Sequence, residues 1–101
     1  MGLKITTPLH TNKGETSEMY LNIEMMIYNK NNMSNVRLNK YVNKAVRDTN
    51  TNDKCECFEV SSSYLLTFES NELSSEYIQT LIYHKIKTEL EAKGLTVENQ
   101  I

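Results

Sequence analysis

The chain has 101 residues, of which 39% are hydrophobic and 24% are charged, and its formal net charge at pH 7 is −2. These values are typical of a folded globular domain, and so small a net charge argues against bulk attraction to nucleic acid or to an anionic membrane. Because no apolar run approaches the roughly 20 residues needed to cross a bilayer, we expect a soluble protein that is intracellular when it is made and has no membrane partner.

The charge is divided unevenly between the two halves of the chain. Residues 1–54 hold eight Lys or Arg against five Asp or Glu, and residues 55–101 hold three against eight. This asymmetry would suit head-to-tail contact between copies of the chain. It would also arise from two faces that are solvated differently, which is the commoner origin of such a difference.

Residues 1–18 predict one short strand and a polar tract. Residues 3–7, "LKITT", alternate well enough for a strand, and Pro8 would end that strand or confine it to a sheet edge. The tract that follows, "HTNKGETSE", has too little apolar surface to order itself. We therefore expect either a surface loop or an arm that becomes ordered against a partner.

The clearest strand covers residues 19–28, "MYLNIEMMIY", which alternate with period two. One face would carry Met19, Leu21, Ile23, Met25 and Ile27. The other face is polar but includes Tyr20, Met26 and Tyr28, so we expect it to be half exposed or covered by something large.

A second strand is expected over residues 36–42, "VRLNKYV", because the stretch "NKNNMSN" before it predicts a hairpin turn. A helix competes for this region, since Leu38, Val42, Ala45 and Val46 lie at helical spacings. We favour a strand that runs into irregular structure. Residues 47–54, "RDTNTNDK", then predict a loop.

The stretch "KCECFEVSSSYLLTFESNE", residues 54–72, predicts a strand with a bend or bulge at the serines 61–63. Alternate residues of this strand would point to opposite faces. One face would carry Phe58, Val60, Tyr64, Leu66 and Phe68, and the other would carry Cys55, Cys57 and Leu65.

A helix is predicted over residues 74–93. Ser74 or Ser75 can cap its start, and Gly94 is a typical C-terminal stop. Its apolar stripe consists of Ile78, Leu81, Ile82, Ile86 and Leu90. Lys85 and Glu89 interrupt this stripe four residues apart, so the second half of the helix either rises away from the core or faces another subunit.

These elements predict a single α+β domain over residues 1–101, built from a small antiparallel or sandwich-like β-sheet and one C-terminal amphipathic helix. Within it we expect an N-terminal strand and possible arm over 1–18, a β-rich core over 19–70, the helix over 74–93, and a short strand or tail over 95–101.

No residue pattern predicts a catalytic, cofactor or metal site. Cys55 and Cys57 would point to one face of a strand, which suits neither a mutual disulfide nor more than two metal ligands. The histidines, His10 and His84, have no second ligand at a motif spacing. We therefore expect buried or half-buried thiols in a reducing compartment, and no enzyme activity.

The first half of the chain contains basic residues interleaved with tyrosines, a pattern that can bind single-stranded nucleic acid. They are Lys30, Arg37, Lys40, Lys44, Arg47 and Lys54, with Tyr28 and Tyr41. Asp48 and Asp53 dilute the charge, and a solvated edge strand explains the same lysines. Nucleic acid is therefore not the partner we expect.

Taken in order, five segments resemble a small virion protein of tailed bacteriophages, in particular the crAss-like phages. The segments are "GLKITTP", "EMYLNIEMMIYNK", "LNKYVNKAVRD", "KCECFEVSSSYLLTF" and "LIYHKIKTELEAKGLTVE". The resemblance spans nearly the whole chain and contains no catalytic signature.

This resemblance implies a structural subunit of a capsid, collar or tail, located in the virion after synthesis in the host bacterial cytoplasm. Its partners would be other virion proteins, with many copies in a symmetric assembly. Candidate interface residues are Tyr20, Tyr28 and Tyr41 on the hairpin and Lys85 and Glu89 on the helix, because tyrosine and charged anchors suit such surfaces. The alternative is a small phage protein that binds nucleic acid or inhibits a host protein.

Overall fold

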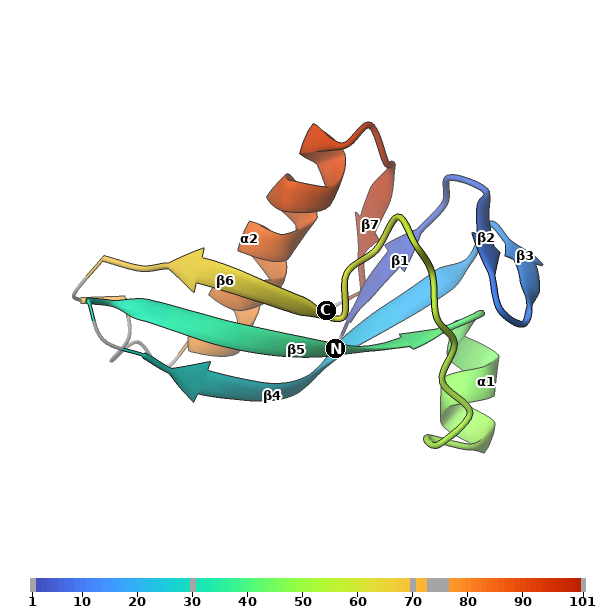
Figure 1. The fold of residues 1–101 in the computed structure, drawn as a ribbon, viewed down its shortest axis with the longest axis horizontal. Coiled ribbons are helices and arrows are strands. Elements are labelled where there is room, and N and C mark those ends of the chain that lie inside the picture. The colour runs from blue at the N-terminus through green and yellow to red at the C-terminus, as the bar shows by residue number, and fades with distance from the viewer. Residues whose placement is uncertain (1, 30, 70, 73–76, 101) are drawn as a thin grey trace.

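An antiparallel sheet of five strands carries one long helix on one of its faces (Figure 1). This computed structural model describes residues 2–29, 31–69, 71–72 and 77–100. The strands run in the order β6-β5-β4-β1-β7 across a curled sheet. Their bounds are β1 Leu3–Ile5, β4 Met19–Tyr28, β5 Met33–Tyr41, β6 Ser63–Thr67 and β7 Val97–Asn99, and the helix, α2, is Ile78–Ala92. The predicted α+β class is confirmed.

The hairpin of β4 and β5 forms the centre of the sheet, as its sequence pattern predicts. Its turn contains Asn31 and Asn32, whose φ angles of 63° and 58° lie in the left-handed region that asparagine tolerates. The strand register shifts between Ile23 and Met25, which marks a β-bulge, so the prediction that Met25 and Ile27 share a face with Met19, Leu21 and Ile23 is wrong. β5 begins earlier than predicted, and the choice between strand and helix is settled as strand up to Tyr41.

Two short segments differ from their predictions in the first half of the chain. The polar tract does not form an arm, because β2 (Leu9–Thr11) and β3 (Gly14–Thr16) pair as a two-stranded hairpin. Gly14 supplies the left-handed turn with φ of 110°. Backbone hydrogen bonds, rather than apolar burial, order this tract, and the amide of Asn12 also donates to the carbonyl of Glu56 at 3.1 Å.

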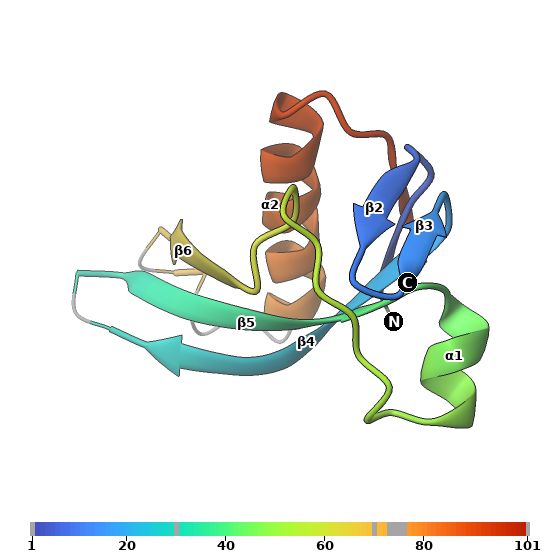
Figure 2. The same ribbon diagram turned by 45° about the vertical axis from the view of Figure 1, so that its right-hand side comes forward.

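The second difference is a short helix, α1 (Lys44–Thr49), where irregular structure and a loop were predicted. The side chain of Asn43 caps it by accepting a 2.8 Å hydrogen bond from the amide of Val46. Figure 2 shows α1 beside the end of the β4–β5 hairpin, at the opposite side of the molecule from the hairpin turn.

Residues 54–62 do not form the predicted strand. Only an isolated bridge joins Cys57 to Val60, and regular pairing starts at β6. The chain instead folds over the core, so that Cys55, Cys57 and Val60 are buried and Phe58 is 99% exposed. Phe58 and Val60, which were predicted to share one face of a strand, therefore lie in different surroundings, because one parity does not persist through an irregular segment.

The helix ends as predicted, in a hydrogen-bonded cap around Gly94, whose φ is 87°. The amide of Gly94 donates to Glu91 at 3.0 Å and that of Leu95 donates to Leu90 at 3.3 Å, which is the Schellman pattern. The proposed caps, Ser74 and Ser75, lie outside the described residues. β7 follows within the predicted 95–101 segment and pairs with β1.

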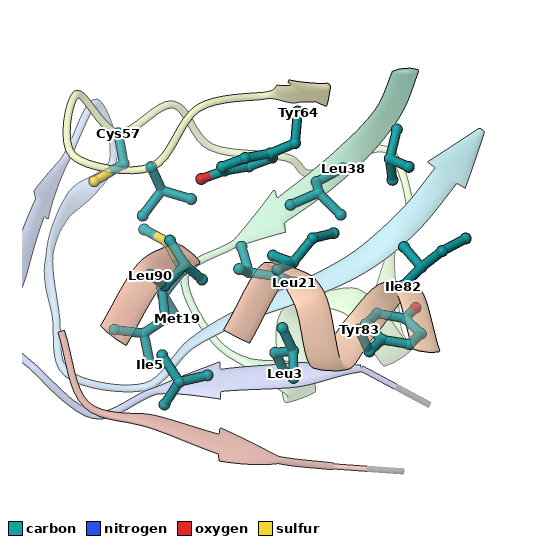
Figure 3. Packing of buried hydrophobic residues seen from close by; sticks show 14 of the residues in the cluster. Leu3, Ile5, Met19, Leu21, Leu38, Cys57, Tyr64, Ile82, Tyr83 and Leu90 are labelled. Carbon is teal, nitrogen blue, oxygen red and sulfur yellow. The ribbon is translucent and has the colours of Figure 1, made fainter. Parts of the chain in front are cut away.

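The main core lies between α2 and the sheet (Figure 3). Residues of β1 and β4 face residues of the helix there, and each is almost fully buried. The strand residues are Leu3, Ile5, Met19 and Leu21, and the helix residues are Ile82, Ile86 and Leu90. Tyr83, which the apolar stripe omitted, is also buried, and Lys85 and Glu89 lie outside this cluster.

Candidate interaction surface

Large apolar side chains are exposed on β4 and β6 in the half of the sheet that is far from α1. Figure 1 shows the ends of β4 and β5 reaching away from α1. The exposed fractions are 45% for Met25, 37% for Met26, 47% for Ile27, 57% for Tyr28 and 55% for Leu65. We call these five residues the outer patch. Large apolar side chains that are exposed close together commonly mark an interaction site.

The strand register shows how the outer patch is arranged. Ile27 is opposite Asn35, and Asn35 is opposite Leu65, so these three residues share a face across three strands. Val36, next to Asn35, is buried in the core under α2, which places the row on the opposite face. The alternating residues Met26 and Tyr28 lie on the helix side. The outer patch therefore occupies both faces of the sheet end.

A groove runs beside the outer patch, between β6 and α2. Its volume is about 580 Å³, and its walls are Leu65, Leu66 and Thr67 from β6 and His84, Lys85, Thr88, Glu89 and Ala92 from α2. Among the described strands, β6 is a terminal strand of the sheet and pairs only with β5. The groove therefore combines an open strand edge with a charged helix face.

Three of the five predicted interface residues lie at these surfaces. Tyr28 belongs to the outer patch, and Lys85 and Glu89 line the groove. The Lys85 ammonium lies 5.2 Å from the centre of the Phe68 ring and 3.8 Å from a carboxylate oxygen of Glu72, and it is half-buried there. Glu89 is exposed.

The placement of Tyr20 and Tyr41 on the surface is corrected by the structure, because each is only 1% exposed. They lie on the sheet face away from α2, where the unpredicted α1 packs. Arg47 of α1 lies 4.9 Å from the centre of the Tyr20 ring. The Tyr41 hydroxyl donates to the carbonyl of Thr51 at 2.7 Å. Burial raises the pKa of Tyr41, and the Arg47 charge partly opposes that rise.

The remaining outer-patch residues, Met25, Met26, Ile27 and Leu65, were not predicted as interface residues. Two signals in the sequence could have indicated them. The second half of β4, "MMIY", is apolar on both parities, and Leu65 is a large apolar residue on the otherwise polar parity of its strand.

The cysteines lie in a buried cluster without the features of a reactive site. Burial raises the pKa of both the Cys55 and the Cys57 thiol, which favours the unreactive protonated form. The Cys57 thiol donates to a Glu59 carboxylate oxygen at 3.1 Å. Within the described parts of the chain, no group of three His, Cys, Asp or Glu residues could hold a metal ion.

Two basic residues of the first half, Lys40 and Arg47, bond to other groups of the protein. Lys40 is 3% exposed, and its ammonium donates to the carbonyl of Val60 at 2.9 Å and to Glu56 at 3.3 Å. Arg47 is paired with Asp48 at 2.8 Å. Lys30 lies outside the described residues. Lys40 and Arg47 are therefore already paired with groups of this chain that would compete with the phosphates of a single-stranded nucleic acid.

Comparison with known proteins adds no relationship to these observations. No protein-family model matches the sequence, and neither the curated proteins nor the solved structures that were searched contain a match. Among the described residues, no helix combines the length and the apolar character that crossing a membrane requires.

Proposed function

We propose that this protein is a non-enzymatic structural subunit of a phage virion that acts by binding neighbouring virion proteins. It would serve as an auxiliary capsid protein, a collar or connector component, or a tail component. The assignment to a virion rests on the resemblance of the five sequence segments. The mode of action rests on one structural observation, the outer patch.

The outer patch supports protein binding because its side chains would gain stability from being covered. Fully burying an exposed side chain of this type yields about 1.5–3 kcal/mol. The five members are roughly half exposed in the chain by itself, so a partner that covered them all would gain several kcal/mol from this term before the costs of association. Tyrosine and methionine are also enriched in the centres of protein interfaces.

The proposal is tested first by mass spectrometry of gradient-purified particles of the phage that encodes the protein. We expect the protein at many copies per particle. Its absence from purified particles would overturn the virion assignment.

A second experiment tests whether the outer patch is the contact. Ile27→Lys places a charge in the patch, and Phe58→Lys is a matched control at an apolar residue that is 99% exposed elsewhere. During infection with tagged copies, we expect Ile27→Lys to reduce incorporation into particles at least tenfold, and Phe58→Lys to be incorporated normally. Equal incorporation of both variants would contradict a role for the outer patch.

A further inference from the structure

We propose that the open edge of β6 pairs with β6 of a second copy of this chain, antiparallel and about a two-fold axis at Leu65. The inference rests on the assembly role proposed above and deepens it by naming a second copy as the partner at the groove. Four features of the described residues carry it: the lack of edge protection, the direction of the backbone groups, the symmetry of the strand sequence, and the charges on the groove wall.

The edge of β6 lacks the devices that keep strand edges apart. Its sequence, Ser63-Tyr64-Leu65-Leu66-Thr67, contains no charge and no proline, and its paired register with β5 shows no bulge. The other end of the sheet is different, because β7 has only three residues and carries Glu98, whose carboxylate lies 3.9 Å from the Lys4 ammonium. Exposed edges without charge, proline or bulge readily pair with another strand.

The backbone of β6 directs every second residue toward the open side. The carbonyl of Ser62 accepts a hydrogen bond from Leu38 of β5, and the amide of Phe68 donates to Asn32, each at 2.8 Å. Hydrogen-bonding direction alternates along an antiparallel strand, so the even-numbered residues of this segment face β5. The amides and carbonyls of Ser63, Leu65 and Thr67 therefore face the groove, where an added strand would bond to them.

The sequence of β6 is chemically symmetric about Leu65. A two-fold axis at that residue places Leu65 opposite its own copy and Ser63 opposite Thr67 of the second copy. Each of these pairs can exchange two backbone hydrogen bonds, and the hydroxyl residues can also interact across the strands. Leu65, which is 55% exposed in one copy, would be covered by the Leu65 of the other. This self-complementarity favours a second copy over an unrelated strand.

The groove wall carries opposite charges in an order that suits the same axis. Lys85 and Glu89 line the groove one helical turn apart on α2. An axis normal to the sheet places both copies of α2 on the same face and in opposite directions. Lys85 of one copy would then lie opposite Glu89 of the other copy, and Glu89 opposite Lys85. Opposite charges would therefore meet across the axis, rather than like charges.

Leu65→Cys tests the contact by cross-linking. Opposite residues in a hydrogen-bonded antiparallel pair have Cα and Cβ atoms about 5.5 Å apart, which a short bifunctional thiol reagent can span. The native cysteines are only 1% and 7% exposed, so the wild-type chain sets a low background. We expect a short bifunctional thiol reagent to join Leu65→Cys into a covalent dimer at least tenfold faster than the exposed control Phe58→Cys. Equal rates for the two variants would overturn the proposal.

Sedimentation of the Leu65→Pro variant tests the backbone pairing without using cysteine. Proline removes an amide that faces the groove and takes no bond from the β5–β6 ladder, so the monomer should keep its fold, as checked by circular dichroism. We expect the dimer dissociation constant to rise at least tenfold in Leu65→Pro and less than threefold in Leu65→Thr, which keeps the amide. A dimer that Leu65→Pro leaves intact would contradict the proposal, and the cross-linking result decides it if Leu65→Pro does not fold.

These experiments separate the failure of this inference from the failure of the proposed function. A monomeric wild-type chain that is nevertheless found in purified particles would overturn the β6 contact and leave the virion role supported. A dimer that cross-links through Leu65→Cys but is absent from particles would support the contact and overturn the virion role.

Discussion

The hydroxyl oxygen of Tyr83 in α2 accepts a 2.8 Å hydrogen bond from the backbone amide of Ile23 in β4. Ile23 lies at the β-bulge, where the register between β4 and β5 shifts. A bulge leaves a local gap in the ladder, and the Tyr83 hydroxyl satisfies the amide at that gap from the opposite layer. This contact fixes the helix over the point where the sheet bends.

We therefore expect Tyr83→Phe to lower the free energy of unfolding by about 1–3 kcal/mol, because it leaves a partly buried amide without this acceptor while keeping the ring. Urea denaturation followed by circular dichroism measures the change. Tyr28→Phe is the matched control, since Tyr28 is 57% exposed, and its effect should stay within about 0.5 kcal/mol. Equal stabilities for wild type and Tyr83→Phe would show that the bond contributes nothing net.

Alkaline pH should destabilise the fold through its buried tyrosines. Burial raises the pKa of Tyr41, Tyr64 and Tyr83 in the folded state above the unfolded value of about 10. The folded state therefore holds these phenol protons more tightly, so this stability is fully present below pH of about 10 and is lost as pH rises through the raised pKa values. Thermal melting between pH 8 and 11 should show a falling midpoint, with a shallower decline in Tyr83→Phe. A parallel decline in both proteins would exclude a contribution from Tyr83.

Elements with a sustained periodic pattern were predictable from the sequence. The alternating segment 19–28 indicated the strand β4, although a bulge reverses the faces in its second half, and α2 combines an apolar stripe with a glycine stop at Gly94. The β2–β3 hairpin was missed because backbone pairing, one left-handed glycine, Gly14, and a single buried residue, Leu9, hold it together. The segment 54–62 was misassigned because tertiary packing, rather than strand pairing, decides which of its side chains point inward.

The candidate interaction surface was predicted only in part for a related reason. A period-two pattern places Tyr20 and Tyr28 on one face of β4, but it indicates neither the bulge between Ile23 and Met25, which puts Tyr28 on the helix side, nor the short helix that covers Tyr20. The six-residue α1 covers Tyr20 and Tyr41 at one end, and the other end leaves Tyr28 and its neighbours exposed. Without a prediction of α1, the buried and the exposed tyrosines could not be distinguished.

The two thiols should be protected in the folded protein. Burial raises the pKa of Cys55 and Cys57, so little thiolate forms at pH 8 and access to it is restricted. We expect a colourimetric thiol reagent to react with the native protein at least about tenfold more slowly than with the same protein in concentrated urea. Reaction of either cysteine at the unfolded rate under native conditions would contradict its burial.

Gly2 lies where the backbone leaves no room for a side chain. A Cβ atom at this position would meet the hydroxyl of Tyr20 and lie 2.5 Å from the carbonyl oxygen of Leu21. The carbonyl of Gly2 also accepts a 2.9 Å hydrogen bond from the amide of Gln100, which links it to the segment after β7. We therefore expect Gly2→Ala to lower the free energy of unfolding by about 1–3 kcal/mol, as overpacking does in well-packed interiors.

A double variant distinguishes the two contacts of the added methyl group in Gly2→Ala. Tyr20→Phe removes the hydroxyl but leaves the carbonyl of Leu21 in place. Because that carbonyl belongs to the β1–β4 ladder and cannot move freely, we expect Tyr20→Phe to restore only part of the stability that Gly2→Ala removes, as measured by urea denaturation of all four proteins in the cycle. Full restoration would show that the hydroxyl alone excludes a side chain at residue 2.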